Sequence, residues 1–137
     1  MIRQAQARDA EAVFTLAKDF ATSFAVEEMA FRATFAKVLC DSRGRLMVAE
    51  VENVVVGYVL AFSHDTFYAN GRVAWIEEIA VSAKYRRQGI GKSLMKNVED
   101  WAARHNCKLV ALATRRAANF DEAIGYESSA TYFRKVI

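Results

Sequence analysis

The stretch from residue 75 to residue 104 constrains this fold most, because its hydrophobic period changes part-way along it. The apolar run from Ile76 to Val81 predicts a buried strand, and spacings of three and four from Ile90 onward predict one face of an amphipathic helix. That helical face consists of Ile90, Leu94, Val98, Trp101 and Ala102. The strand and the helix are joined by Arg-Arg-Gln-Gly-Ile-Gly-Lys at residues 86–92.

The joining segment has the composition of an anion site. Gly89 and Gly91 let backbone or ligand approach closely, and the first amides of a helix point outward at the positive end of its dipole. Arg86, Arg87 and Lys92 add positive charge at the same place. We therefore predict a phosphate-bearing ligand, although a plain helix start with solvated arginines also explains an isolated match.

The glycine spacing excludes two common phosphate motifs. A P-loop requires G-x-x-x-x-G-K-[ST] and a dinucleotide fingerprint requires G-x-G-x-x-G, whereas residues 84–88 contain no glycine and Gly91 is followed by Lys92, Ser93 and Leu94. The spacing that is present is R-x-x-G-x-G, beginning at Arg86.

A strand carrying E-E-I-A-V, then R-x-x-G-x-G, then a helix carrying Leu94-Met95 resembles the core motif of the GNAT N-acetyltransferase superfamily. The resemblance implies an α/β (α+β) fold, with a mixed central sheet of about six to seven strands flanked by about four helices. It also implies a single domain over residues 1–137.

The resemblance further implies that acetyl-CoA is the co-substrate. Its pyrophosphate would lie on Arg86, Arg87, Gln88, Gly89, Ile90, Gly91 and Lys92. Backbone amides of Ile79, Ala80 and Val81 would hold the pantetheine arm and face the oxyanion. The first two helices and their connection would cover the acceptor.

The rest of the chain has the order that this resemblance requires. Strands are predicted at residues 1–6, 46–51, 54–62, 73–81, 108–114 and 132–137, with the fifth of these parallel to the fourth, and helices at residues 9–20 and 26–39. Asp9 is the expected cap of the first helix. Ala117, Phe120, Gly125 and Tyr126 match the short closing helix and the G-[FY] pair of the family.

Acyl transfer to an amine requires a group that accepts the proton of the amine. Glu77 and Glu78 are the two candidate bases. Neighbouring strand residues face opposite sides unless a bulge intervenes, so the choice between them stays open. No covalent enzyme intermediate is needed, and we expect Cys40 and Cys107 to be core thiols.

One position departs from the family pattern. Asp121 follows Phe120, where many members carry the tyrosine proposed as general acid. An aspartate can protonate a leaving thiolate only if burial raises its pKa strongly. Tyr126 or a water is the alternative acid, or the thiolate leaves without one.

Composition narrows the function classes. The net charge of +3 is concentrated in a few clusters, so we expect no nucleic-acid partner. No apolar run approaches the roughly 20 residues of a membrane span, and we expect a cytoplasmic protein with no membrane partner and no metal. The sequence therefore predicts an acetyl-CoA-dependent N-acetyltransferase that acts on a primary amine of a small molecule or a protein. A non-catalytic acyl-CoA-binding or sensing module is the alternative.

Two further expectations concern partners. Acidic residues near the expected site favour a cationic amine as acceptor; they are Glu27, Glu28, Asp65, Glu77 and Glu78. The aromatic residues of the last predicted strand, Tyr132 and Phe133, make a homodimer an expectation.

Overall fold

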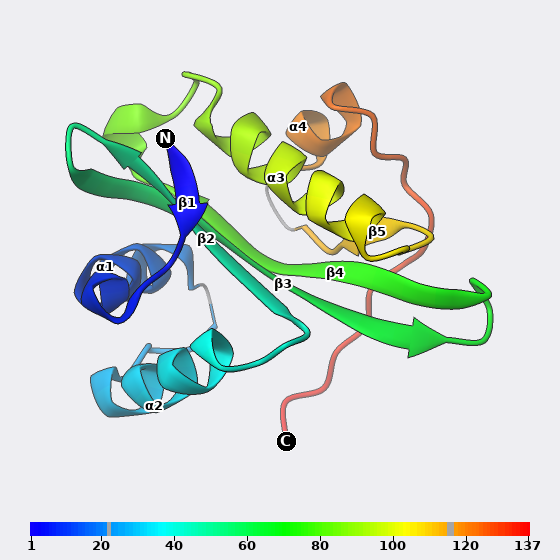
Figure 1. The fold of residues 1–137 in the computed structure, drawn as a ribbon, viewed down its shortest axis with the longest axis horizontal. Coiled ribbons are helices and arrows are strands. Elements are labelled where there is room, and N and C mark those ends of the chain that lie inside the picture. The colour runs from blue at the N-terminus through cyan, green and yellow to red at the C-terminus, as the bar shows by residue number, and fades with distance from the viewer. Residues whose placement is uncertain (22, 115–116) are drawn as a thin grey trace.

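Nine strands and α-helices follow one another in the computed structural model, which describes residues 1–21, 23–114 and 117–137. In chain order they are β1 (Ile2–Gln4), α1 (Ala10–Phe20), α2 (Glu28–Leu39), β2 (Gly44–Val51), β3 (Val54–Thr66), β4 (Gly71–Val81), α3 (Ile90–Arg104), β5 (Val110–Leu112) and α4 (Ala118–Ala123). Two 3-10 turns, η1 (Ala7–Asp9) and η2 (Ala83–Tyr85), precede α1 and follow β4. Helices α1 and α2 cover one face of the sheet, and α3 and α4 lie on the other (Figure 1).

The strands lie in the order β1-β2-β3-β4-β5. The first three pairs are antiparallel, and β5 runs parallel to β4. β3 and β4 form a long hairpin, whereas β5 pairs with β4 over only Ala74–Ile76. The predicted strand-helix-strand unit with parallel strands is therefore confirmed.

Two apolar cores hold the layers together. On the α3 face, Leu94 and Val98 are fully buried and Trp101 is 4% exposed, which confirms the predicted helical stripe. On the opposite face, α1 and α2 pack on Tyr58 and its neighbours in β2 and β3. Burying each large apolar side chain contributes about 1.5–3 kcal/mol, so both faces of the sheet are needed for stability.

The strand count is lower than predicted, at five among the described residues instead of six to seven. The expected last strand at residues 132–137 is absent, and its side chains are exposed. Aromatic and β-branched residues favour a strand only where a neighbouring strand is there to pair with. The prediction of about four helices is confirmed.

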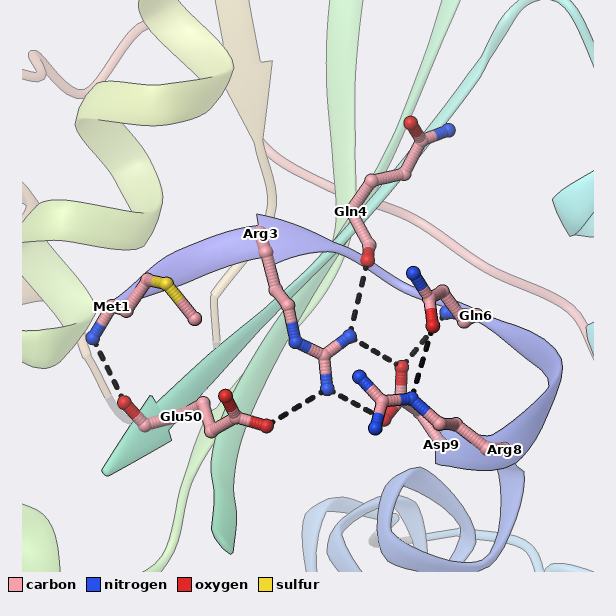
Figure 2. A network of polar contacts seen from close by, with 7 residues as sticks. All are labelled: Met1, Arg3, Gln4, Gln6, Arg8, Asp9 and Glu50. Carbon is pink, nitrogen blue, oxygen red and sulfur yellow. Dashed lines mark hydrogen bonds and ion pairs between the residues drawn. The ribbon is translucent and has the colours of Figure 1, made fainter. Parts of the chain in front are cut away.

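Asp9 occupies the N-cap position of α1, as expected, but its side chain makes no capping hydrogen bond to that helix, because its carboxylate has other partners. It accepts two hydrogen bonds of 2.8 Å from the Arg3 guanidinium and one from the Gln6 amide (Figure 2). Arg3 also donates to Glu50 at 3.0 Å. This cluster ties β1 to β2 and to the start of α1, and the Arg3 guanidinium holds the pKa of Asp9 below its usual value.

We expect Arg3→Met to lower the free energy of unfolding at pH 7 by about 2–3 kcal/mol, because it leaves a buried carboxylate without its cation. Asp9 has a lowered pKa, so its contribution is present above the ordinary value of 3.8 and is lost as the pH falls through the lowered pKa. The difference in the free energy of unfolding between wild type and variant should therefore become smaller at acidic pH. Urea denaturation at pH 7 and well below pH 3.8 measures it.

Arg32→Met is the matched control. Arg32 pairs with Glu28 on the exposed surface of α2, where such pairs contribute about 0–1 kcal/mol. Equal effects of the two variants at pH 7 would show that the Arg3 cluster carries no special share of the stability.

Candidate active site

A β-bulge in β4 decides how the two glutamates point. Leu60 of β3 lies opposite Glu78, and the next residue, Ala61, lies opposite Ile76, so Glu77 is the extra residue of β4. After the bulge the alternation is reset, with Ile79 on the α3 core and Ala80 on the α1/α2 side. Glu78 therefore belongs to the α1/α2 face and is half-buried, whereas Glu77 is exposed.

Glu78 is held by a buried tyrosine. The Tyr58 hydroxyl donates to Oε1 of Glu78 at 2.6 Å, and Tyr58 itself is 1% exposed in the core under α1 and α2. Burial, and then the charge and hydrogen bond of Glu78, raise the pKa of Tyr58. The hydroxyl therefore keeps its proton and remains a donor to the carboxylate.

Among the described residues, the second half of β4 pairs with a neighbouring strand on one side only. β3 pairs with β4 as far as Val81, but β5 accompanies β4 only to Ile76. The backbone of Glu77 to Val81 consequently has an open edge on the side of β5, including the three positions expected to hold the pantetheine arm. Such an edge presents N–H and C=O groups to a ligand.

The segment after β4 leads the chain into α3 through two backbone conformations with positive φ. These are Arg87 at 63° and Gly89, the N-cap of α3, at 83°. Arg86 ties the segment to the end of β4, since its Nε donates to the Val81 carbonyl at 3.0 Å. Arg86, Arg87, Gln88 and Gly89 are exposed, as a cradle for a solvated anion requires.

The first turn of α3 has free donors. The Ser93 amide bonds to the Gly89 carbonyl at 3.0 Å and is the first amide of the helix to do so, so the amides of Ile90, Gly91 and Lys92 have no acceptor within the helix. A Cβ added at Gly89 would meet no atom within 4 Å, which leaves room for a ligand against the backbone. Phe120 of α4 lies near Gly91, where an added Cβ would make an ordinary van der Waals contact with the ring at 3.4 Å.

Asp121 lies next to this contact between α4 and α3. It is 7% exposed, its Oδ2 has no hydrogen-bond partner in the described structure, and burial raises its pKa. An aspartate can serve as the general acid only if burial raises its pKa, and the pKa of Asp121 is shifted in that direction. The hydroxyl of Tyr126 is already engaged, since it donates to Oε2 of Glu99 at 2.9 Å.

The structure separates some expected acidic neighbours. Asp65 lies near the far end of the β3–β4 hairpin, opposite Arg72, well away from the bulge at Glu78. Glu27 instead lines an open hollow of about 400 Å³, together with Phe24, Ala25, Val26, Ala30, Phe31 and Thr34. Cys40 is exposed and is not a core thiol, while Cys107 is half-buried against the α3 core.

Tyr58 is the polar site residue that the sequence did not reveal. It lies inside the apolar run of β3, where an aromatic residue indicates packing and nothing else. The sequence does carry a signal for the bulge that brings Glu78 to Tyr58. Ile76 and Ile79 are three residues apart, which departs from the strand period of two and indicates a bulge between them.

Comparison with known proteins identifies the family. Residues 10–126 match the model of the Acetyltransferase (GNAT) family. The chain belongs to the GNAT acetyltransferase family. A thialysine N-epsilon-acetyltransferase from Bos taurus is 38% identical over an alignment of 76 residues, and the match covers 52% of this chain and 44% of that enzyme. The match thus spans less than half the length of that curated relative.

Two solved structures illustrate the fold. A transcriptional regulator from Bacillus halodurans C-125 superposes with a TM-score of 0.90 at 23% identity, over 100% of this chain and 99% of its own. AAC(6')-Iy in complex with the bisubstrate analog CoA-S-monomethyl-acetylneamine superposes with a TM-score of 0.83 at 23% identity, over 100% of this chain and 98% of its own. At these identities the likeness concerns the fold alone.

The residues of this GNAT domain fit the phosphates of CoA. The first turn of α3 and its N-cap combine three features that suit a phosphate. They are backbone amides without an acceptor in the helix, open space next to Gly89, and the positive charge of Lys92. The described residues include no group of three or more His, Cys, Asp or Glu placed to hold a metal ion. None of the helices described is long and apolar enough to cross a membrane.

We expect Gly89→Glu to weaken binding of CoA and acetyl-CoA at least about 100-fold, because a carboxylate would face the anion and a side chain would occupy its approach. Isothermal titration calorimetry of both ligands measures the loss. Gly125→Glu is the matched control, since Gly125 also has a positive φ, of 100°, and also meets no atom within 4 Å. Binding unchanged in Gly89→Glu, or lost equally in both, would contradict the cradle.

We expect Asp121→Asn to raise the free energy of unfolding at pH 7, because the amide carries no charge to desolvate. The raised pKa of Asp121 means that wild type loses stability as the pH rises from the ordinary value of 3.8 through the raised one. The advantage of the variant should therefore grow over that range and vanish below it. Urea denaturation across pH measures this, with Glu122→Gln as the exposed control in the same helix.

Proposed function

We propose that this protein transfers the acetyl group of acetyl-CoA directly to a primary amine of a small molecule or a protein. The observation that carries the proposal is the Glu78 carboxylate, which the buried Tyr58 hydroxyl holds at the bulge of β4. This carboxylate lies on β4 just beyond the point where β5 stops pairing with that strand. The chain then leads from the end of β4 to the proposed anion cradle at the start of α3. A module that only binds acyl-CoA needs the cradle and has no use for a positioned carboxylate.

Glu78 is assigned as the group that takes the proton of the amine, directly or through water. An ammonium nitrogen has no lone pair, so it must lose a proton before it attacks a thioester. Tyr58 fixes one carboxylate oxygen of Glu78, which leaves the other to face the acceptor. Glu77, exposed at the same bulge, is assigned to attraction of the acceptor.

The edge of β4 and the start of α3 are assigned to acetyl-CoA, which supplies the activated acetyl thioester. The amides of residues 79–81 lie on the open part of β4 and can hydrogen-bond the pantetheine arm and the carbonyl oxygen that gains charge. Gln88, Ile90 and the rest of residues 86–92 form the pyrophosphate cradle.

Asp121 is the first candidate for the acid that serves the departing thiolate. Its burial raises its pKa, which is the direction that favours a protonated carboxyl. Tyr126 is the weaker candidate, because its hydroxyl proton is directed at Glu99 and its pKa is also raised.

The acceptor is proposed to be a cationic amine. Glu77 and Glu78 supply negative charge at the bulge. The curated relative, a thialysine N-epsilon-acetyltransferase, acts by its name on a side-chain amine.

We expect Glu78→Gln to lower kcat/KM by about 10²–10⁴-fold and Glu77→Gln by less than about tenfold, because only the first removes a positioned proton acceptor. Release of free CoA thiol, measured with a panel of small primary amines, follows the reaction. Both variants should bind acetyl-CoA as wild type does in calorimetry.

Tyr58→Phe keeps the packing and removes only the hydrogen bond to Glu78. It should lower kcat in the wild-type background and have little further effect in Glu78→Gln, because the two residues act as a unit. Full activity in Glu78→Gln would overturn the assignment of the base. Binding of acetyl-CoA without acetylation of any amine would favour the alternative of a binding or sensing module.

A further inference from the structure

Among the described residues, two arginines without a carboxylate partner lie between β2 and the second half of α3. Arg45 is the second residue of β2, and its Nη2 donates to Oδ1 of Asn97 on α3 at 3.2 Å. Arg104 lies on the same face of α3 as Asn97, two turns further along, because residues seven apart in a helix share a face. This pair differs from Arg3, whose guanidinium is bound by two carboxylates.

The charge around Arg45 is positive. Burial is the larger cause that lowers the pKa of Arg45, and the charge of Arg104 lowers it further. No carboxylate of the described residues shifts it in the other direction. Asp100, one turn before Arg104, is engaged elsewhere, since its Oδ1 accepts from Nζ of Lys96 at 2.5 Å. The fold therefore holds two cations close together, and no described anionic group offsets their repulsion.

The same cluster has hydrogen-bond donors in excess. Nε of Arg45 is buried and has no partner among the described residues. Asn97 accepts through its carbonyl oxygen, so its Nδ2 remains a donor. Arg104 is exposed, and its side chain makes no hydrogen bond or ion pair within the described structure. Because a guanidinium presents its N–H groups as a planar fork that matches phosphate oxygens, this donor set suits an oxyanion.

The cluster is open to solvent and separate from the cradle at the start of α3. β1 pairs with β2 only between Met47 and Ala49, so Arg45 lies beyond the end of β1 and is half-exposed. Along α3, Asn97 is about 12 Å from Gly89 at 1.5 Å per residue. β3 and β4 lie between β2 and the open edge of β4 that is proposed for acetyl-CoA.

We propose that Arg45, Asn97 and Arg104 form a binding site for a small divalent oxyanion, either inorganic phosphate or the phosphate group of a metabolite. The Arg45 fork and the Asn97 amide hold two of its oxygens, and Arg104 approaches it from the solvent side. The dianion offsets the repulsion between the two cations and supplies the acceptor that Nε of Arg45 lacks. It also joins β2 to α3, so the occupied protein is the more stable one. This inference is independent of the acetyl-transfer proposal.

Titration with sodium phosphate at constant ionic strength, followed by the NMR signals of the two tryptophan indoles, tests the site. Trp101 lies between Asn97 and Arg104 on α3, whereas Trp75 in β4 faces the other side of the sheet. We expect the Trp101 signal to shift until the site is saturated and the Trp75 signal to stay in place. A Trp101 signal that does not respond to phosphate would overturn the proposal.

Arg45→Gln and Arg104→Gln should each weaken phosphate binding about tenfold or more, because each removes charge-assisted hydrogen bonds. Arg104 is exposed, so its replacement leaves the core intact. Arg32→Gln is the matched control, since it removes one positive charge from the exposed face of α2 and should leave the Kd unchanged. Equal weakening by Arg32→Gln and Arg45→Gln would reduce the effect to general attraction by net charge and overturn the site.

The cradle at the start of α3 is the other place where phosphate could bind. The titration is therefore repeated in Gly89→Glu, in which the Trp101 shift should persist with an unchanged Kd. Its loss in Gly89→Glu would assign the phosphate to the cradle and overturn the proposal. A site that fails these tests leaves the proposed function untouched, because acetyl transfer does not use Arg45, Asn97 or Arg104.

Thermal unfolding separates a binding site from a structural tether between β2 and α3. Phosphate at tenfold excess over its Kd should raise the Tm of wild type about 4 °C more than that of Arg45→Gln. The comparison cancels the general stabilisation that phosphate gives to any protein. Equal shifts of Tm in both proteins would show that Arg45 serves as a tether only, and would overturn the site.

Two further ligands define the class of anion. Tighter binding of glycerol 3-phosphate than of inorganic phosphate would assign the site to a phosphorylated metabolite, whereas equal or weaker binding would assign it to free phosphate. Acetate, with a single charge, should bind about tenfold more weakly than phosphate or worse. Acetate that binds as tightly as phosphate would contradict a site for a divalent oxyanion.

Discussion

The pairing of β4 with β3, interrupted by one extra residue, is the constraint on which the two cores and the candidate site depend. Ile76, Ile79 and Val81 must all face the α3 core, and a regular strand with a period of two cannot place them there. The bulge at Glu77 resolves the conflict. It also keeps Glu78 out of the α3 core, where an unpaired carboxylate would cost several kcal/mol, and brings it to Tyr58. Packing and chemistry are thus set by the same backbone irregularity.

Three buried or half-buried acidic groups show how differently one fold treats a carboxylate. Asp9 is fully engaged by Arg3 and Gln6, and its lowered pKa is that of a structural ion pair. Glu78 has one neutral donor, which orients it without neutralising it. Asp121 is buried beside the contact of α4 with α3 and has no donor for its Oδ2 in the described structure, so burial raises its pKa. A buried carboxyl group with a raised pKa, such as that of Asp121, is typical of functional sites.

The parts of the fold that were predicted correctly are those with long, regular patterns. The stripe from Ile90 to Ala102 predicted α3, and the apolar runs predicted β2 to β4. The tail at residues 132–137 was predicted as a strand because its composition suits one, but no strand forms within a single chain. Asp9 does occupy the N-cap position of α1, but its carboxylate does not cap the helix, because Arg3 of β1 competes for it. Composition describes what a segment can do, and its neighbours decide what it does.

The sequence by itself determined the order of the elements, the α3 stripe and the basic, glycine-containing segment from Arg86 to Lys92, because these depend on residues close together in the chain. Tertiary structure alone decided which glutamate is held and what holds it, since Tyr58 and Glu78 are twenty positions apart and meet through strand register. It also decided that Asp121 is buried, with no hydrogen-bond partner for its Oδ2 among the described residues, and that β5 ends its pairing at Ile76. A local pattern encodes period and conformational preference, whereas burial, pKa and strand pairing arise from residues that are brought together only when the sheet forms.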